Sequence, residues 1–114
     1  MPIELLVSEN TDIEQVCVTG SGMPQPVALV VLNAENGHKN QAVVDRLNGS
    51  LDKLNGELES HERLAALFVV ETPWTIENEL LTATMKLKRD NIERRYREVL
   101  MSTNPSGVVW EADI

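Results

Sequence analysis

The sequence predicts an α+β fold in which a small β-sheet with a hairpin is flanked by helices. Short apolar runs have the length and the β-branched content of strands, and two longer segments repeat apolar residues every three or four positions. In chain order the predicted elements are strand, strand, helix, strand, hairpin and helix, which implies helices packed on a small sheet. The length of 114 residues supports one domain, residues 1–114, with a modest core.

The first predicted elements are a helical turn and two strands. Residues 3–7 can form a helical turn, which the turn-forming residues 10–12 end. The segment Ile13–Thr19 is rich in β-branched residues, and Val27–Leu32 is a continuous apolar run. A turn cluster, GSGMP at residues 20–24, separates the two runs. We therefore expect them to pair as a hairpin.

A helix and a third strand follow. Asn40 can cap a helix over residues 40–59, and its apolar residues form one stripe. The stripe consists of Val43, Leu47, Leu51, Leu54 and Leu58. Residues 64–71 form a second continuous apolar run of the kind found in buried strands, and Pro73 ends it.

The last predicted element is a helix. Asp90, with Glu93 three residues later, can cap a helix that carries Ile92, Tyr96, Val99 and Leu100 on one side. Residues 102–107 are predicted to be a loop, and the acidic tail behind them has an apolar patch at residues 108–110. Whether Trp110 folds onto the sheet, or meets another domain or a second copy, stays open.

Composition excludes several classes of function. The formal net charge of −8 makes nucleic acid and anionic membrane surfaces poor general partners. The one cysteine, Cys17, lies in an apolar strand pattern, which favours a buried inert thiol in a reducing cytosol. No apolar run approaches the roughly 20 residues of a membrane span. His38 and His61 lie far apart without metal-ligand spacing, so we expect a cytoplasmic protein without a metal site.

The segment with the most functional information is residues 81–89, LTATMKLKR, preceded by ETPWTIEN at residues 71–78. It puts two lysines and an arginine on a short polar loop between a strand and an amphipathic helix, where a scaffold can present side chains to a ligand. A lysine ammonium is a compact charge on a flexible stem, suited to phosphate and carboxylate oxygens. From the residues alone, the alternative that these lysines only keep a loop soluble stays open.

This segment resembles the last signature motif of the AMP-forming acyl-CoA synthetases, the adenylate-forming ligases. Their C-terminal domain carries a lysine in a Gly-Lys-x-x-Arg or Thr-x-Lys-Leu-Lys-Arg setting, and the long-chain fatty acid branch matches best. The stretches PIE at 2–4, IEQVCVTG at 13–20 and PQPVALVVL at 24–32 agree with that branch. The resemblance covers about residues 1–101 and leaves 102–114 as a tail.

The resemblance implies site residues and a mechanism. Aligning Arg89 with the arginine of the family motif puts the catalytic position at Lys86, with Thr84, Lys88 and Arg89 as supporting loop residues. Arg89 is expected to anchor the helix start or to pair with a carboxylate. The implied function is that of a mobile C-terminal domain, which supplies Lys86 to ATP-dependent fatty acid adenylation and then rotates to help form the thioester with coenzyme A.

The resemblance also implies partners. ATP with Mg²⁺ and coenzyme A would be bound mainly by a large N-terminal domain that this chain lacks, and the fatty acid would be the other substrate. We therefore expect an excised domain that is inactive and holds no cofactor by itself. A homodimer, and membrane association of the full-length enzyme, stay open.

The chain departs from the long-chain branch at two loop positions. That branch has glycine and proline where this sequence has Glu79 and Ala83. If position 79 needs a positive φ, glutamate costs on the order of 1 kcal/mol there, unless Asn78 takes the left-handed conformation instead. Ala83 lacks the fixed φ of proline. These departures bear on the rigidity of the loop more than on the role of Lys86.

Two other functions are compatible with the residues. The chain could be a free-standing, non-enzymatic α+β module that binds a protein or regulates a ligase. Alternatively, the lysine loop could bind a nucleotide or an acyl phosphate by itself. The second alternative is disfavoured because no phosphate-binding loop accompanies the lysines: the GSG at residues 20–22 opens a strand hairpin rather than a helix.

Overall fold

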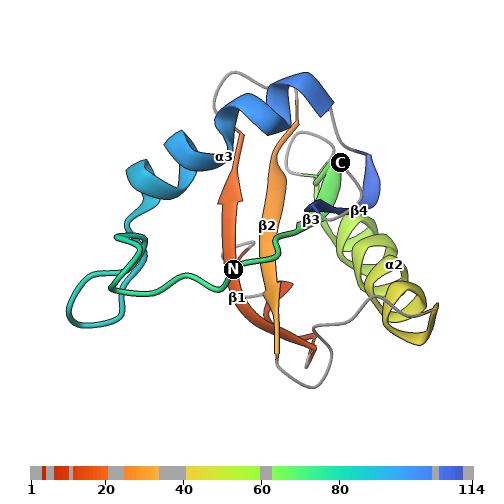
Figure 1. Ribbon diagram of the computed structural model, residues 1–114. Helices are drawn as coiled ribbons and strands as arrows, with labels where there is room; N and C mark the ends of the chain where they lie inside the picture. The colour runs from red at the N-terminus through yellow and green to blue at the C-terminus, as the bar shows by residue number, and fades with distance from the viewer. Residues whose placement is uncertain are drawn as a thin grey trace.

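The computed structural model describes residues 4, 7–10, 12–20, 25–33, 41–59, 63–103 and 106–111. The named elements are, in order, β1 (Ile13–Thr19), β2 (Val27–Leu32), α2 (Gln41–Glu57), β3 (Ala66–Val69), α3 (Arg89–Thr103) and β4 (Gly107–Trp110) (Figure 1). Of the predicted N-terminal turn, Glu4 and Val7 are described as helical, and the Ser8 N–H donates to the Glu4 carbonyl at 3.0 Å. Asn40 and most of the turn at 20–24 lie outside the described residues.

The four described strands form one mixed sheet in the order β1-β2-β3-β4. β1 and β2 are antiparallel, which confirms the predicted pairing of the first two strands, and their register shifts between Ile13 and Gln15. β2 and β3 are parallel, as are β3 and β4. The small sheet with helices on its faces is the predicted α+β fold.

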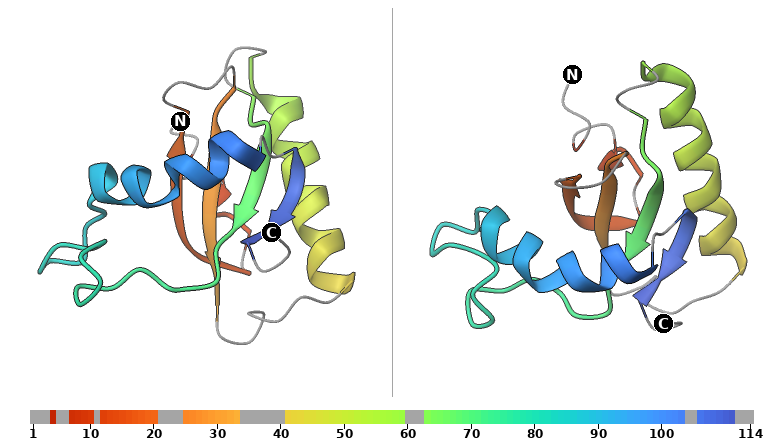
Figure 2. Two further views of the ribbon diagram at one scale, coloured as in Figure 1. Left: turned by 45° about the horizontal axis from the view of Figure 1, so that its top comes forward. Right: turned by 90° about the horizontal axis from the view of Figure 1, so that it is seen from above.

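The two helices lie on opposite faces of the sheet (Figure 2). Because successive strand residues point to opposite faces, β2 supplies both layers. Ala28, Val30 and Leu32 pack with the stripe of α2, whereas Val27, Leu29 and Val31 pack with the apolar side of α3. The stripe on α2 is the predicted one, with Val43, Leu47, Leu51 and Leu54 buried and Leu58 partly buried. The continuous apolar run of β2 thus reflects a strand covered on both faces.

The C-terminal part differs from the prediction. α3 begins at Arg89, so Asp90 lies in its first turn rather than at the cap, and α3 continues through Thr103 into the segment predicted as a loop. The apolar patch of the predicted tail is β4, and Trp110 folds onto the sheet with only 7% of its surface exposed. β4 escaped prediction because four residues carry little periodicity, and the strand depends on pairing with β3.

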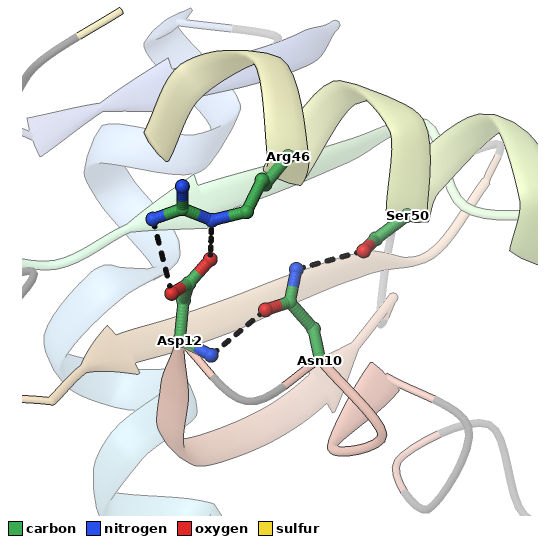
Figure 3. A network of polar contacts seen from close by, with 4 residues as sticks. All are labelled: Asn10, Asp12, Arg46 and Ser50. Atoms are coloured by element: carbon green, nitrogen blue, oxygen red, sulfur yellow. Dashed lines mark hydrogen bonds and ion pairs between the residues drawn. The ribbon is translucent and has the colours of Figure 1, made fainter. Parts of the chain in front are cut away.

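A polar network ties Asn10 and Asp12, which precede β1, to α2 (Figure 3). Arg46 donates two hydrogen bonds to the Asp12 carboxylate, at 2.6 and 3.2 Å. Asn10 donates to the Ser50 hydroxyl at 2.7 Å and accepts the Asp12 N–H at 2.8 Å. Bidentate arginine–carboxylate pairs fix geometry as well as charge. The network therefore holds the start of β1 against the helix that covers this face.

Candidate functional site

The predicted site lies in the segment between β3 and α3, residues 70–88, which we call the lysine lobe. The lobe leaves β3, passes β1 and extends beyond the edge of the sheet before it returns to α3 (Figure 1). Gln15 holds its start: the side-chain amide donates to the Trp74 carbonyl and accepts the Trp74 N–H, both at 3.0 Å. The Trp74 indole N–H donates to the Tyr96 hydroxyl at 3.4 Å. β1 and α3 thus both anchor the base of the lobe.

Asn78 organises the first turn of the lobe. Its side-chain oxygen accepts the Thr75 N–H at 2.9 Å, its own N–H donates to the Thr75 hydroxyl at 3.1 Å, and its side-chain amide donates to the Pro73 carbonyl at 3.0 Å. Glu79, and not Asn78, takes the left-handed conformation, with φ of 65°. The Glu79 carbonyl accepts the side-chain amide of Asn91 from α3 at 2.8 Å. The strain foreseen at position 79 is therefore present.

The second turn is a tight hairpin that presents Lys86. Leu81 and Leu87 form an isolated antiparallel bridge. The Met85 N–H donates to the Thr82 carbonyl at 2.9 Å, the Thr82 N–H to the Lys86 carbonyl at 2.8 Å, and the Lys86 N–H to the Thr82 hydroxyl at 3.1 Å. Met85 has φ of 65°, a left-handed residue of the kind that closes a three-residue hairpin loop. Both backbone groups of Lys86 are therefore fixed.

The predicted site residues differ in their exposure. Thr84 and Lys86 are exposed, Lys88 is half-buried, and Leu87 between the lysines packs against the α3 layer of the core. The hydroxyls of Thr84 and Thr82 lie 3.1 Å apart. Within the described part of the chain, neither lysine forms an ion pair. A shallow hollow of about 390 Å³, lined by residues 87–91, lies beside Lys88 at the start of α3.

Arg89 makes an ion pair. Its guanidinium donates to both carboxylate oxygens of Glu4, at 2.7 Å for the Nη1–Oε2 contact, which confirms that Arg89 pairs with a carboxylate. The hydrogen bond from Arg89 lowers the pKa of Glu4, and the pKa of Arg89 is raised in turn. The same Oε2 accepts the Val18 N–H of β1 at 2.8 Å. Glu4 was not among the predicted site residues, because no local pattern links positions 85 residues apart.

Cys17 lies beneath this ion pair. The thiol is fully buried, and Arg89 Nη1 donates to its Sγ at 3.9 Å. Burial raises the pKa of Cys17 to about 11, so the thiol stays protonated at neutral pH. This agrees with the predicted buried, inert thiol.

The described residues offer no metal site and no membrane span. They contain no group of three or more histidine, cysteine or acidic side chains placed to hold a metal ion. None of the helices described is long and apolar enough to span a membrane.

Residues 1–103 match the family model of the AMP-binding enzyme C-terminal domain. The chain is 31% identical over 119 residues to long-chain-fatty-acid–CoA ligase 5 of Mus musculus, covering 88% of this chain and 17% of the mouse protein. It is 26% identical over 104 residues to the chloroplastic long-chain-fatty-acid acyl-carrier-protein ligase AEE15 of Arabidopsis thaliana, covering 86% of this chain and 14% of that protein. The chain thus spans less than a fifth of the length of these relatives.

Solved structures show the same fold. The adenylation domain of a carboxylate reductase from Mycobacterium chelonae superposes with a TM-score of 0.74 at 26% identity, covering 90% of this chain and 17% of that one. The A-PCP didomain of carboxylic acid reductase from Segniliparus rugosus, in complex with AMP, gives 0.72 at 29% identity, covering 88% of this chain and 15% of that one.

Proposed function

Because the chain belongs to the family of AMP-binding enzyme C-terminal domains, we propose that it is the mobile C-terminal domain of a long-chain fatty acid CoA ligase. In that enzyme it supplies Lys86 to the adenylation of a fatty acid by ATP. The observation that carries the proposal is the hairpin at residues 81–87, which fixes the backbone of Lys86 and leaves its side chain exposed. The similarity to long-chain fatty acid ligases supports the substrate class.

Adenylation joins a carboxylate to the α-phosphate of ATP while pyrophosphate leaves. Several negative oxygens are crowded together in its transition state, so a positioned cation lowers the barrier. The Lys86 ammonium would contact the carboxylate and the phosphate oxygens, and its flexible stem does not demand a planar geometry. ATP with its Mg²⁺ would be held mainly by a large N-terminal domain of the same enzyme.

The geometry favours Lys86 over Lys88 for this role. Lys86 is exposed at the hairpin and has no ion pair among the described side chains. Lys88 is half-buried, and its backbone is used at the base of the lobe: its N–H donates to the Leu80 carbonyl at 2.9 Å, and its carbonyl accepts the Ile92 N–H at 3.0 Å. Lys88 thus lies at the base of the lobe, directly before α3. In this proposal Lys88, Thr84 and Arg89 are supporting residues.

The second half-reaction, attack of the coenzyme A thiol on the acyl adenylate, would follow a rotation of this domain. Such closures exclude water and complete a catalytic site, and they need interfaces weak enough to reform. Lys86 would then leave the reacting atoms. Its loss should therefore affect adenylation strongly and thioester formation little.

The test is ATP–pyrophosphate exchange in long-chain-fatty-acid–CoA ligase 5 whose own C-terminal domain is replaced by this chain. Lys86→Ala should lower exchange by about 10²- to 10³-fold, because it removes one positioned charge donor from the transition state. Lys88→Ala is the matched control: Lys88 is half-buried at the base of the lobe, so this variant should retain most of the activity. Transfer from preformed acyl adenylate to coenzyme A should change little in either variant.

Comparable exchange in the Lys86→Ala and unmutated chimeras would overturn the assigned lysine role. An equal loss of exchange activity in Lys86→Ala and Lys88→Ala would instead show that adenylation needs the combined charge of both lysines. The isolated chain is expected to show neither half-reaction.

A further inference from the structure

We propose that Glu4 is a positioning residue for the lysine lobe, acting through Arg89. The proposal rests on the proposed function for its catalytic consequence, but the positioning itself is a property of this chain. Among the contacts of the described residues, Glu4 has none with Lys86 or Lys88. Its carboxylate joins three segments that are distant in sequence: the N-terminal turn, β1 and the first residue of α3.

The first step of the argument is the arrangement of hydrogen bonds at Glu4. Oε2 accepts both the Val18 N–H and an Arg89 N–H, while Oε1 accepts the second Arg89 N–H. The Glu4 side chain is 24% exposed and that of Arg89 is 52% exposed. A bidentate, partly buried pair restricts orientation more than an isolated surface pair does. Arg89 is thus held against the edge of the sheet at β1.

The second step is the position of Arg89 relative to Lys86. Arg89 lies three residues after Lys86 and begins α3, so it marks the point where the lobe returns to the body of the domain. The start of the lobe is held independently, by Gln15 and Trp74. At the end of the lobe, Arg89 reaches β1 in two ways: through Glu4, which accepts the Val18 N–H, and through the longer 3.9 Å contact with Cys17 Sγ. The Glu4 pair is the charged and shorter of the two links. Loosening this pair should therefore let the hairpin move relative to the sheet.

The chain contains a matched control for this pair. Asp12 and Arg46 also form a bidentate ion pair, which joins the residue before β1 to α2, on the other face of the sheet (Figure 3). Glu4→Gln and Asp12→Asn each turn a carboxylate into an amide of nearly the same shape. Both remove an ion pair, but only the first adjoins the lobe.

The test is amide hydrogen exchange of the 114-residue chain, followed by NMR, with each variant at a temperature where it is folded. A loss of global stability by itself speeds amide exchange by a calculable factor. In Glu4→Gln, we expect the amides of Thr82, Lys86 and Lys88 to exchange about tenfold faster than this factor, because local opening of the lobe adds to global unfolding. In Asp12→Asn, these amides should follow global stability alone. Arg89→Gln and the double variant with Glu4→Gln should show the same exchange rates of the lobe amides as Glu4→Gln alone. The effects of two partners in one interaction are not additive.

A kinetic measurement in the chimera separates positioning from a general loss of folding. Glu4→Gln should lower kcat for adenylation by at least about tenfold with KM changed less than about twofold, as expected when a reacting group is misplaced. Asp12→Asn should leave kcat unchanged.

The outcomes distinguish the two proposals. Lobe amides that respond equally to Glu4→Gln and Asp12→Asn would overturn the positioning role, whatever Lys86 does. A selective response of the lobe in Glu4→Gln, together with full activity in Lys86→Ala, would retain the positioning role and overturn the proposed function.

Discussion

Glu79 and Met85 hold the left-handed backbone conformation, both with φ of 65°, and both lie in the lysine lobe. Such conformations are unfavourable for residues with a Cβ, and they persist where surrounding contacts demand them. At Glu79 those contacts come from the Asn78 turn and from the Asn91 side chain on its carbonyl. Backbone strain in the described chain is thus concentrated where the proposed function places the catalytic lysine.

Replacing the strained glutamate should stabilise the protein. Glu79→Gly removes the Cβ and keeps the carbonyl that accepts the Asn91 amide, so we expect a gain of about 0.5–1 kcal/mol, visible as a Tm a few degrees higher in thermal unfolding. Glu77→Gly is the control, since Glu77 is exposed and has no positive φ. It should be neutral or destabilising. A stability loss in Glu79→Gly equal to that in Glu77→Gly would contradict the assignment of strain.

The ion pair of Glu4 predicts a pH dependence of stability. Arg89 lowers the pKa of Glu4 below its ordinary value of 4.5, so Glu4 stabilises the fold above that value, and this contribution is lost as the pH falls through the lowered pKa. The free energy of unfolding of the unmutated chain should therefore exceed that of Glu4→Gln at neutral pH. The difference should shrink in acid, below about pH 4.5.

Urea titrations of the two chains between pH 2 and pH 7 measure this difference. Because the other carboxylates are common to both chains, their titration largely cancels in the comparison. A difference that is constant across this range would show that Glu4 does not titrate through the pair with Arg89.

At the scale of elements, the Gln15 side chain attaches the lysine lobe to β1 by two hydrogen bonds to the Trp74 backbone. Gln15 follows the register shift in β1, and its amide satisfies the N–H and the carbonyl of Trp74 as a neighbouring strand would. Gln15→Leu leaves both backbone groups without these partners and should cost about 1–3 kcal/mol in urea unfolding. Gln41→Leu is the control, because its bond to Asp45 is exposed on α2, and it should change stability by less than about 0.5 kcal/mol. An equal loss of unfolding free energy in Gln15→Leu and Gln41→Leu would show that the Gln15–Trp74 hydrogen bonds have no special role in stability.

The elements that could be predicted from the sequence are those with a local signal. Ile13–Thr19 and Val27–Leu32 have the bounds expected from their composition, and the stripe of α2 follows from its spacing. β3 is shorter than the apolar run over residues 64–71, because pairing with both neighbours ends at Val69. The lengths of paired strands depend on partners that the local pattern does not contain.

The candidate site was predictable only in part for the same reason. The spacing of the lysines and the arginine is local, and so is the hairpin between Leu81 and Leu87. The groups that hold the lobe are 59 and 85 residues away from their partners, at Gln15 and Glu4. Side chains that act through long-range contacts leave no periodicity to detect.

At the scale of the whole molecule, β4 completes the sheet. The family match ends at residue 103, whereas β4 lies at Gly107–Trp110 and buries Trp110 against the α2 layer. We propose that the folding unit extends at least to Trp110. Its loss would uncover the edge of β3 and remove a large aromatic side chain from the core.

Shortening the chain after Thr103 should therefore destabilise it by about 3–5 kcal/mol, the usual cost of losing a buried tryptophan. A chain shortened after Glu111 is the control, since it keeps β4 and the hydrogen bond from the Glu71 N–H to the Glu111 carboxylate. Urea unfolding measures both. Equal stability of the chain ending at Thr103 and the chain ending at Glu111 would show that β4 is dispensable.

The two tryptophans of this chain lie in different layers of the core, one on each face of the sheet. Trp74 lies in the α3 layer and Trp110 in the α2 layer, with the sheet between them. With only two tryptophans in the sequence, Trp74→Phe and Trp110→Phe each leave a fluorophore that reports one side of the sheet. Equal denaturation midpoints for the two variants would show that the domain unfolds as one cooperative unit. Different midpoints would show that the α3 layer, with the lysine lobe, unfolds independently of the α2 layer. The domain thus carries an intrinsic optical reporter for each half of its interior.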